Sequence, residues 1–295
     1  MSLVVILLGL LSLAAVYYVV IWAQDIIKNW NEPDNSNPIL GFVIGIITNF
    51  FDVLGIGNFS TITLASQLTG FIKNNRLLPG MLNIASVVPV LIEAFLFISN
   101  VEVGAVTLLS LIIAAVVGAL VGGRIVTKLP EYKIQIVMGF ALLITAFLMF
   151  AKKIGWLALL GENNTAVNLT GIALIIGIVG NIIFGALTMA GVGLYAPCLA
   201  MVSLLGLNPK VAFPIMMGSC AALMAMGSPK FIKEGMYPRK GTLGLAIGGI
   251  VGVFIGYQFV KSLSVDSLIW IIIVVVIYTG IMMLRKGFKN HQKIV

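Results

Sequence analysis

Apolar segments of membrane-spanning length follow one another along nearly the whole chain, and charged residues stand mostly at the segment ends. A helix of roughly 20 apolar residues crosses the hydrocarbon core of a bilayer. Hydrophobic residues make up 60% of the chain and charged residues 9%, a balance that excludes an ordinary soluble domain. Because backbone polar groups must be paired within lipid, the segments are expected to be helices. The sequence therefore predicts an all-α polytopic membrane protein, multi-pass in the cell membrane, with the lipid bilayer around it.

The segment boundaries predict an N-terminal unit followed by two similar halves. We expect 1–37 to hold a first span and a polar cytoplasmic connection, 38–160 a first repeat, and 161–295 a second repeat with a basic cytoplasmic tail. The start has no basic leader and no convincing cleavage site, so we expect its apolar run to be retained as a span. The expected apolar segments are 1–23, 38–54, 59–72, 77–98, 103–127, 132–151, 169–190, 194–207, 210–229, 241–260 and 266–284.

A ladder of small residues recurs in the two halves. Adding 134 to the numbers of Ser110, Ala114, Gly118 and Gly122 gives Gly244, Gly248, Gly252 and Gly256. Small residues four positions apart let two helices approach closely in lipid, so we interpret the ladders as packing surfaces, with a pore lining as the alternative. The shared spacing indicates an internal duplication.

Each half also contains one apolar segment that a Gly-x-Gly break interrupts. The breaks lie at Gly55 and Gly57 in the first half and at Gly191 and Gly193 in the second, an offset of 136. Glycine-interrupted hydrophobic segments at corresponding positions of two halves point to the binding site of a secondary transporter. We therefore expect the breaks to be the tips of broken helices that meet near the middle of the membrane.

Two topologies distribute the 18 Lys and Arg residues differently. If each broken segment crosses the membrane, nine spans result, and the better orientation places 11 of these residues inside and 7 outside. If each broken segment returns to its own side, about seven full spans and two re-entrant hairpins remain, with 14 inside and 4 outside. The positive-inside rule favours this second, inverted-repeat topology, with the N-terminus outside and the C-terminus cytoplasmic. The nine-span alternative stays open because 169–190 is long enough to cross alone.

The helices that begin after the breaks are predicted to hold a small anion. The first N–H groups of a helix are unpaired and carry the positive end of its dipole, so opposed tips attract negative charge without a basic side chain. For Ser and Thr, the alternative is a structural hydrogen bond to the helix backbone. The expected binding residues are Gly55, Gly57, Asn58, Ser60, Thr61, Gly191, Gly193 and Tyr195.

Two carboxylates, Asp52 and Glu93, lie well inside apolar segments. Acids within a membrane are costly and mark ion or proton pathways. We predict that Asp52, three residues before Gly55, carries a coupling proton; the alternative is that it only braces the break. Glu93 is the second coupling candidate, and its place nearer a segment end would also let it reach water.

The residues speak against enzyme chemistry. An intramembrane aspartyl protease needs two carboxylates that share a proton, whereas Asn58 follows the first break. The single histidine, His291, lies in the basic tail, which leaves no base for a serine nucleophile and no zinc site. We expect no catalytic residue, metal or cofactor. The net charge of +8 is spread over segment ends, so nucleic acid is not an expected partner. A channel and a homo-oligomer remain open.

Further motifs accompany the two breaks. Each break is followed by a short helix and then by a span that opens with Arg76 or Lys210, and the stretches 78–83, 118–122 and 208–212 read LPGMLN, GALVG and NPKVA. From about residue 38 to 286 this pattern resembles the TauE/SafE sulfite exporter family, the toluene-sulfonate uptake permease group. The resemblance implies secondary-active transport of sulfur-containing anions such as sulfite, thiosulfate or organosulfonates across a bacterial or archaeal inner membrane, as export or as uptake.

Overall fold

The computed structural model describes residues 3–53, 57–97, 103–156, 164–208, 211–259 and 266–292. Almost all of this part of the chain is helical, and its β-structure is one isolated bridge between Ala166 and Leu207. The all-α prediction is confirmed. Gly55, one of the expected binding residues, lies outside the described residues.

The helices reproduce the expected segments, including both interruptions. α1 continues to Lys28, past the expected end of the first apolar segment. The elements are α1 (Leu3–Lys28), α2 (Pro38–Val53), α3 (Asn58–Thr69), η1 (Asn75–Leu77), α4 (Leu78–Phe97), α5 (Ala105–Val126), α6 (Glu131–Lys153), α8 (Gly171–Met189), α9 (Tyr195–Leu204), α10 (Ala212–Lys233), α11 (Arg239–Phe259) and α12 (Asp266–Gln292).

The element order confirms the internal repeat. α2 to α6 and α8 to α12 each consist of a broken pair of helices followed by three long ones. The first residues of α10 and α4 are 212 and 78, and those of α11 and α5 are 239 and 105, so both pairs have the offset of 134. The last residues of α8 and α2 are 189 and 53, which is the offset of 136. The structure therefore repeats at the two offsets found in the sequence.

The first broken pair, α2 and α3, returns to the side from which it starts. The start of α2 packs against the start of α11, where Gly41 faces the backbone of Gly241. The ring of Phe71, directly after α3, lies beside the same two glycines. The two ends of this hairpin are therefore neighbours, as the re-entrant topology requires.

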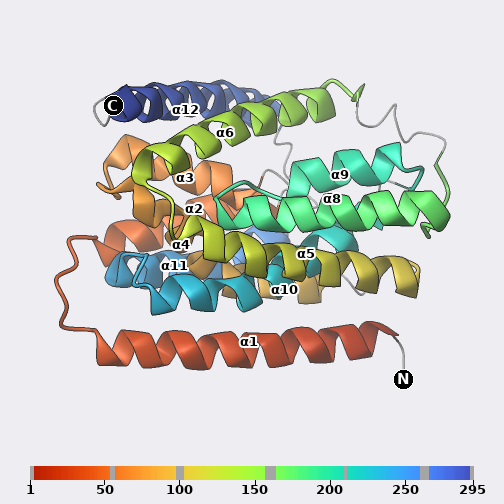
Figure 1. The fold of residues 1–295 in the computed structure, drawn as a ribbon, viewed down its shortest axis with the longest axis horizontal. Helices are drawn as coiled ribbons and strands as arrows, with labels where there is room; N and C mark the ends of the chain where they lie inside the picture. The colour runs from red at the N-terminus through yellow and green to blue at the C-terminus, as the bar shows by residue number, and fades with distance from the viewer. Residues whose placement is uncertain are drawn as a thin grey trace.

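The second broken pair, α8 and α9, returns to the opposite side. Just before α8, the Leu169 amide donates to the Thr107 hydroxyl at the start of α5 (2.8 Å). After α9, the Asn208 amide donates to the Ala166 carbonyl (2.9 Å), so this hairpin also closes on itself. The other end of α5 lies with the first hairpin's side, where the Arg76 guanidinium donates to the Thr127 carbonyl (3.3 Å). The hairpins enter from opposite faces (Figure 1).

Helix length alone would not have settled this topology. Within the described residues, seven helices are long and apolar enough to cross a membrane, namely α1, α4 with the turn before it, α5, α6, α8, α10 and α11. α8 is one of them, yet its chain turns back through α9. The observed path therefore excludes the nine-span alternative for the described hairpins.

The glycine ladders pack each hairpin against the opposite repeat. The ladder of α11 lies on backbone carbonyls of α2, and that of α5 lies on carbonyls of α8. The pairs are Gly244 with Pro38, Gly248 with Phe42, Gly252 with Ile46, Gly118 with Ile182 and Gly122 with Ala186. Packing, rather than a pore lining, is the observed role of the ladders.

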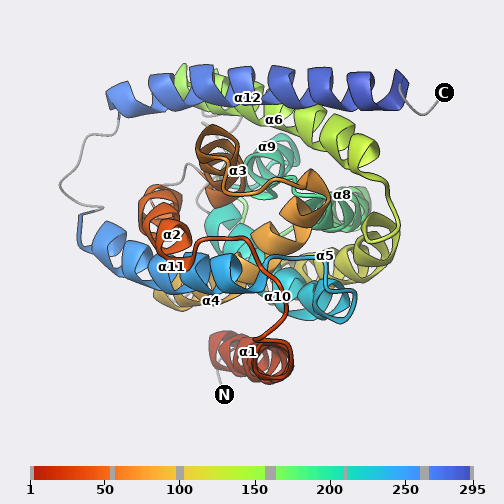
Figure 2. The ribbon, with the colours of Figure 1, turned by 90° about the vertical axis from the view of Figure 1, so that its left-hand side faces the viewer.

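Three layers surround the hairpins (Figure 2). α6 and α12 cross on one side, and α1 lies alone on the other, against α4 and α10. The buried Tyr18 hydroxyl of α1 donates to the Ile84 carbonyl of α4 (2.7 Å). α4 and α10, whose spans are the most deeply buried, stand between α1 and the hairpin tips.

Candidate functional site

The two hairpin tips share one cavity. Its volume is about 40 Å³, and an ordered water needs about 10–15 Å³ by the same measure, so there is room for a few waters or a small solute. Both repeats contribute to the wall. The lining residues are Asp52, Gly57, Asn58, Phe59, Ser60, Val90, Ala141, Leu142, Thr145, Thr188, Gly191, Val192, Gly193, Leu194, Tyr195, Cys220 and Met224.

The first tip presents the uncapped start of α3 to this cavity. Gly57 precedes the helix with φ 89° and ψ 128°, a conformation that favours glycine, and no side chain caps the first N–H groups. The side-chain amide of Asn58 is turned into the protein, where it donates to Asn49 (3.1 Å) and Ser86 (3.2 Å). Asn58 therefore uses its side-chain donors as a brace, and its backbone amide is directed toward Asp52 at the cavity wall.

Ser60 and Thr61, which were both predicted to bind the anion, have different surroundings. Ser60 lines the cavity, and its hydroxyl makes no hydrogen bond to the described residues. The Thr61 hydroxyl donates to the carbonyls of Gly57 (3.2 Å) and Asn58 (2.9 Å), and Thr61 does not line the cavity. For Thr61 the backbone-bonded alternative is the observed one.

The second tip begins with a tight helix end. The amides of Gly191 and Val192 donate back to the carbonyls of Thr188 (2.9 Å) and Leu187 (3.1 Å), the Schellman arrangement that ends a helix at a glycine. Gly191 has φ 94°, whereas Gly193 does not have positive φ. Both glycines reach the cavity.

α9 then starts at the cavity wall with few donors. No side chain caps its first turn. Tyr195 and the following residue supply backbone N–H groups, but Pro197 has none. The start of α9 therefore offers fewer amides than the start of α3.

The two predicted coupling acids lie in one buried cluster. Asp52 lines the cavity and is 1% exposed; the amide of Asn58 approaches its carboxylate without completing a hydrogen bond. Glu93 is fully buried, so the suggestion that it reaches water is wrong. The Tyr195 hydroxyl donates to Glu93 Oε2 (3.2 Å), and both acids interact electrostatically with each other and with Tyr195.

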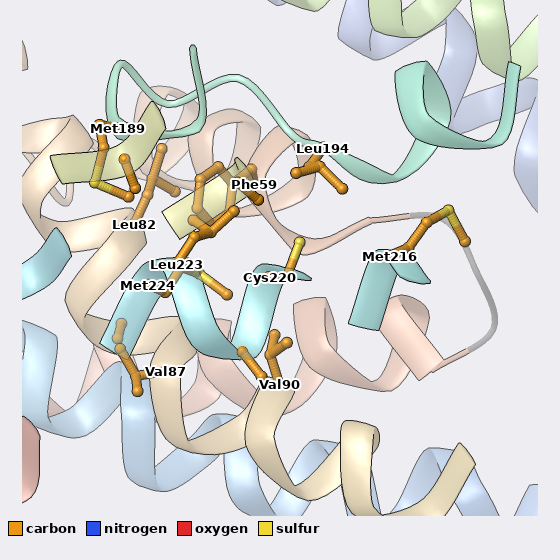
Figure 3. Packing of buried hydrophobic residues seen from close by; sticks show 14 of the residues in the cluster. Phe59, Leu82, Val87, Val90, Met189, Leu194, Met216, Cys220, Leu223 and Met224 are labelled. Atoms are coloured by element: carbon orange, nitrogen blue, oxygen red, sulfur yellow. The ribbon is translucent and has the colours of Figure 1, made fainter. Parts of the chain in front are cut away.

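Several cavity residues were missed by the sequence analysis. α6 contributes the Thr145 hydroxyl, which has no partner among the described residues, and α10 contributes Cys220 and Met224. Figure 3 shows the Cys220 side chain on the side of α10 that faces Phe59 of α3 and Leu194 before α9. The offset of 134 could have linked Met224 to Val90, which also lines the cavity, but no sequence signal marked either one.

A further polar residue holds the second tip from the first repeat. The side-chain amide of Asn83 on α4 donates to the Thr188 carbonyl (3.0 Å) and to Pro79 within its own helix (2.9 Å). α4 thus contacts both tips: Ser86 holds Asn58, while Asn83 and Glu93 hold the second hairpin.

The charge of the cavity wall is unusual for an anion site built from side chains. No Lys, Arg or His occurs among the described lining residues, and Asp52 is the charged residue that lines it. The described residues also contain no group of three His, Cys, Asp or Glu side chains that could hold a metal ion. The polar groups available are backbone amides and the hydroxyls of Ser60, Thr145 and Tyr195.

Comparison with known proteins finds one matching family model in the second half of the chain. Residues 172–294 match the family model described as sulfite exporter TauE/SafE. A search among curated proteins gives no match. The matched range covers α8 to α12, the second repeat from its broken helix to its tail. Over these residues the chain is similar to the TauE/SafE sulfite exporter family, which confirms the resemblance carried by its sequence motifs.

Proposed function

We propose that the protein is a secondary-active carrier of small sulfur-containing anions, which bind between the starts of α3 and α9. The observation that carries this proposal is the meeting of two uncapped helix starts, from hairpins of opposite orientation, at one cavity whose described lining residues include no basic side chain. Unpaired amides and the positive ends of two helix dipoles, which converge on the cavity, favour a compact oxyanion there. Ser60, Thr145 and Tyr195 would add hydroxyl donors.

The absence of a fixed positive charge among the described lining residues suits a carrier. A lysine or arginine would bind an anion tightly and hold it, whereas amide and hydroxyl donors give a site that releases its ligand. The small cavity favours compact groups such as sulfite, thiosulfate or a sulfonate head. The family description names sulfite exporters, which supports this class of substrate.

Asp52 supplies the means to couple transport to protons. An ionised carboxylate beside the amides would repel an anion, and a buried charge without a partner is costly. A protonated Asp52 removes the repulsion, so anion and proton bind more favourably together than apart. We therefore expect the proton and the anion to move in the same direction.

The distribution of charge supports an orientation. Lys28, Lys73, Arg239 and Lys240 lie on the side where the first hairpin opens, as do the basic residues at the end of α12, where Lys286 donates to Gln67. Lys152 and Lys153, at the far end of α6, lie on the other side. The positive-inside rule then makes the first hairpin's side cytoplasmic, with the C-terminus there and the start of α1 outside.

Anion flux into liposomes that contain the purified protein tests the proposal. We expect uptake of a labelled sulfur oxyanion that saturates with concentration and is driven by an inwardly directed proton gradient. Carboxylates and taurine are the comparison substrates. Flux that does not saturate and shows unitary currents would favour the remaining alternative, an anion channel.

A matched pair of variants connects the flux to the cavity. Ser60→Ala removes a hydroxyl that faces the cavity, and Thr61→Val removes one that is bonded within α3. Weaker anion binding in the first variant but not in the second supports the site. Equal binding in both, or thermal stabilisation by none of the anions, would refute it.

A further inference from the structure

Tyr195 stands between the cavity and a buried acid. It lines the cavity from the first turn of α9, while its hydroxyl donates to Glu93 Oε2 on α4 (3.2 Å). Glu93 itself does not line the cavity. Tyr195 therefore forms part of the wall of the proposed anion site, while its hydroxyl is bonded to a carboxylate behind that wall and links the two repeats.

No cation among the described residues balances the charge on Glu93. Its second oxygen, Oε1, is buried without a hydrogen-bond partner. The titratable groups that interact with it are Asp52 from α2 and Tyr195 from α9, and Cys220 from α10 interacts with both acids. No Lys, Arg or His of the described chain acts on it. A carboxylate in this position becomes neutral by binding a proton.

We propose, on the basis of the proposed function, that Tyr195 is a proton-controlled ligand of the transported anion. While Glu93 is ionised, the Tyr195 hydroxyl is held by its carboxylate. When Glu93 takes up one proton from water, it becomes a weaker acceptor, and the hydroxyl turns to donate to the anion in the cavity. In this proton transfer Glu93 gains one O–H bond and the hydronium ion that gives the proton becomes water. No other covalent bond forms or breaks, and the proton remains on Glu93 until the anion leaves.

The energetics favour this exchange of partners. A hydrogen bond to an ionised acceptor is about twice as strong as one between neutral groups. The hydroxyl therefore prefers whichever of its two neighbours carries the negative charge. Neutralising Glu93 also removes its repulsion of the anion, so proton and anion each strengthen the binding of the other.

The arrangement occurs in one repeat only. The position equivalent to Tyr195 is Phe59 (195 − 136), which has no hydroxyl, and the position equivalent to Glu93 is Gly227 (93 + 134). Phe59 lines the same cavity. The duplication thus places two aromatic residues at the site. Tyr195 is the one that has a hydroxyl donor and a buried acid, Glu93, beside it.

Binding of thiosulfate to the purified protein tests the proposal, because the charge of this anion is constant between about pH 6 and about pH 8. Over that range the unmutated protein should bind thiosulfate more weakly as the pH rises. Each linked proton contributes up to about a tenfold change in the dissociation constant per pH unit. Glu93→Gln should bind with a pH slope smaller by about one proton. Tyr195→Phe should bind several-fold more weakly at low pH and should also have a smaller slope, because the hydroxyl no longer passes from Glu93 to the anion; the part of the slope that comes from direct repulsion by Glu93 should remain.

Tyr18→Phe is the matched control. It also removes a buried tyrosine hydroxyl that bonds α4, at Ile84, but on the side away from the cavity. We expect its pH slope to equal that of the unmutated protein. Unchanged slopes in both Glu93→Gln and Tyr195→Phe would overturn the inference alone, whereas an unmutated protein that binds none of the sulfur anions overturns the proposed function as well.

A measurement on the unmutated protein guards against variants that fail to fold. Infrared difference spectra on addition of thiosulfate should show a carboxylate band replaced by a protonated carboxyl band, together with a shifted tyrosine C–O band. Spectra in which the anion changes the carboxyl bands but not the tyrosine band would overturn the role of Tyr195.

Discussion

The hairpins α2–α3 and α8–α9 share a backbone plan and differ in chemistry. Both return helices end alike: Gly70 and Gly206, which are related by the offset of 136, have positive φ. In each case the next amide bonds back into the helix, from Phe71 to Ser66 and from Leu207 to Val202. The tips do not match in this way. The first carries Asp52 and the polar brace of Asn58, where the second has Thr188 and Leu194.

The source of support differs as well. The first tip is braced within its own repeat, from Asn58 to Asn49 and Ser86. The second is held by the other repeat, through Asn83 and Glu93 of α4. α4 therefore has polar contacts to both tips. Its counterpart α10 has Met217, Cys220 and Gly227 at the positions of Asn83, Ser86 and Glu93 (each plus 134). The two repeats have the same helix paths, whereas the polar side chains that contact the tips belong to α4 of the first repeat and not to its counterpart α10.

The largest expected effect tests whether the two hairpins are equally dependent on their ladders. Gly248→Val and Gly118→Val each place side-chain atoms against a backbone carbonyl, of Phe42 and Ile182 respectively. We expect each to cost more than about 3 kcal/mol of stability and to abolish folded protein. Size-exclusion yield and thermal unfolding measure this. Gly9→Val, at an open position on α1, is the control. Sensitivity of only one hairpin would break the symmetry of the scaffold.

The next effect tests the division of chemistry between the tips. Asp52→Asn should strongly reduce proton-driven anion uptake while leaving thermal stability intact, because it removes the coupling carboxyl of the first tip and leaves that of Glu93. Thr188→Val, at the equivalent position of the second tip, should retain uptake driven by the proton gradient. Liposome flux with and without a pH gradient separates the two. Proton-driven uptake by Asp52→Asn at the normal rate would remove its coupling role.

A smaller effect concerns the glycines of the tips. Gly57 has positive φ with open space around it, whereas Gly193 has ordinary φ and its added Cβ would lie 4.0 Å from Phe59. Gly57→Ala should therefore cost about 1–2 kcal/mol through backbone strain, and Gly193→Ala less than about 0.5 kcal/mol. Denaturation of the two variants in matched detergent decides this. Equal losses would show that the positive φ of Gly57 does not make glycine necessary there.

The smallest effect concerns the hydroxyls of α3. Ser60→Ala should raise the dissociation constant of a sulfur anion by about 2–10-fold, the value of one hydrogen bond of about 0.5–1.5 kcal/mol. Thr61→Val should leave it within twofold, because that hydroxyl is bonded to Gly57 and Asn58. Isothermal titration at one pH measures both. A larger loss in Thr61→Val would show that the helix start is held by Thr61 in a way that the anion depends on.

Much of the fold follows from local pattern. The breaks, the ladders and the offsets of 134 and 136 can be found in the sequence, because each depends only on the spacing of glycines and the length of apolar segments. The candidate site was less accessible. Asp52, Gly57, Ser60, Gly191, Gly193 and Tyr195 reach the cavity as expected. Thr61 does not, because a hydroxyl can turn either to its own helix or outward, and sequence does not say which.

The sequence by itself determined that this chain spans a membrane, contains an internal duplication and has one broken helix in each half. The physical reason is that backbone N–H and C=O groups in lipid must be hydrogen-bonded within the protein, which restricts the possible structures. Only the tertiary structure decided which surfaces meet. Each ladder packs on the hairpin of the other repeat, and Tyr195 of the second repeat reaches Glu93 of the first. Such contacts depend on how helices far apart in sequence pack together, and the residue pattern of one segment does not identify the segment that packs against it.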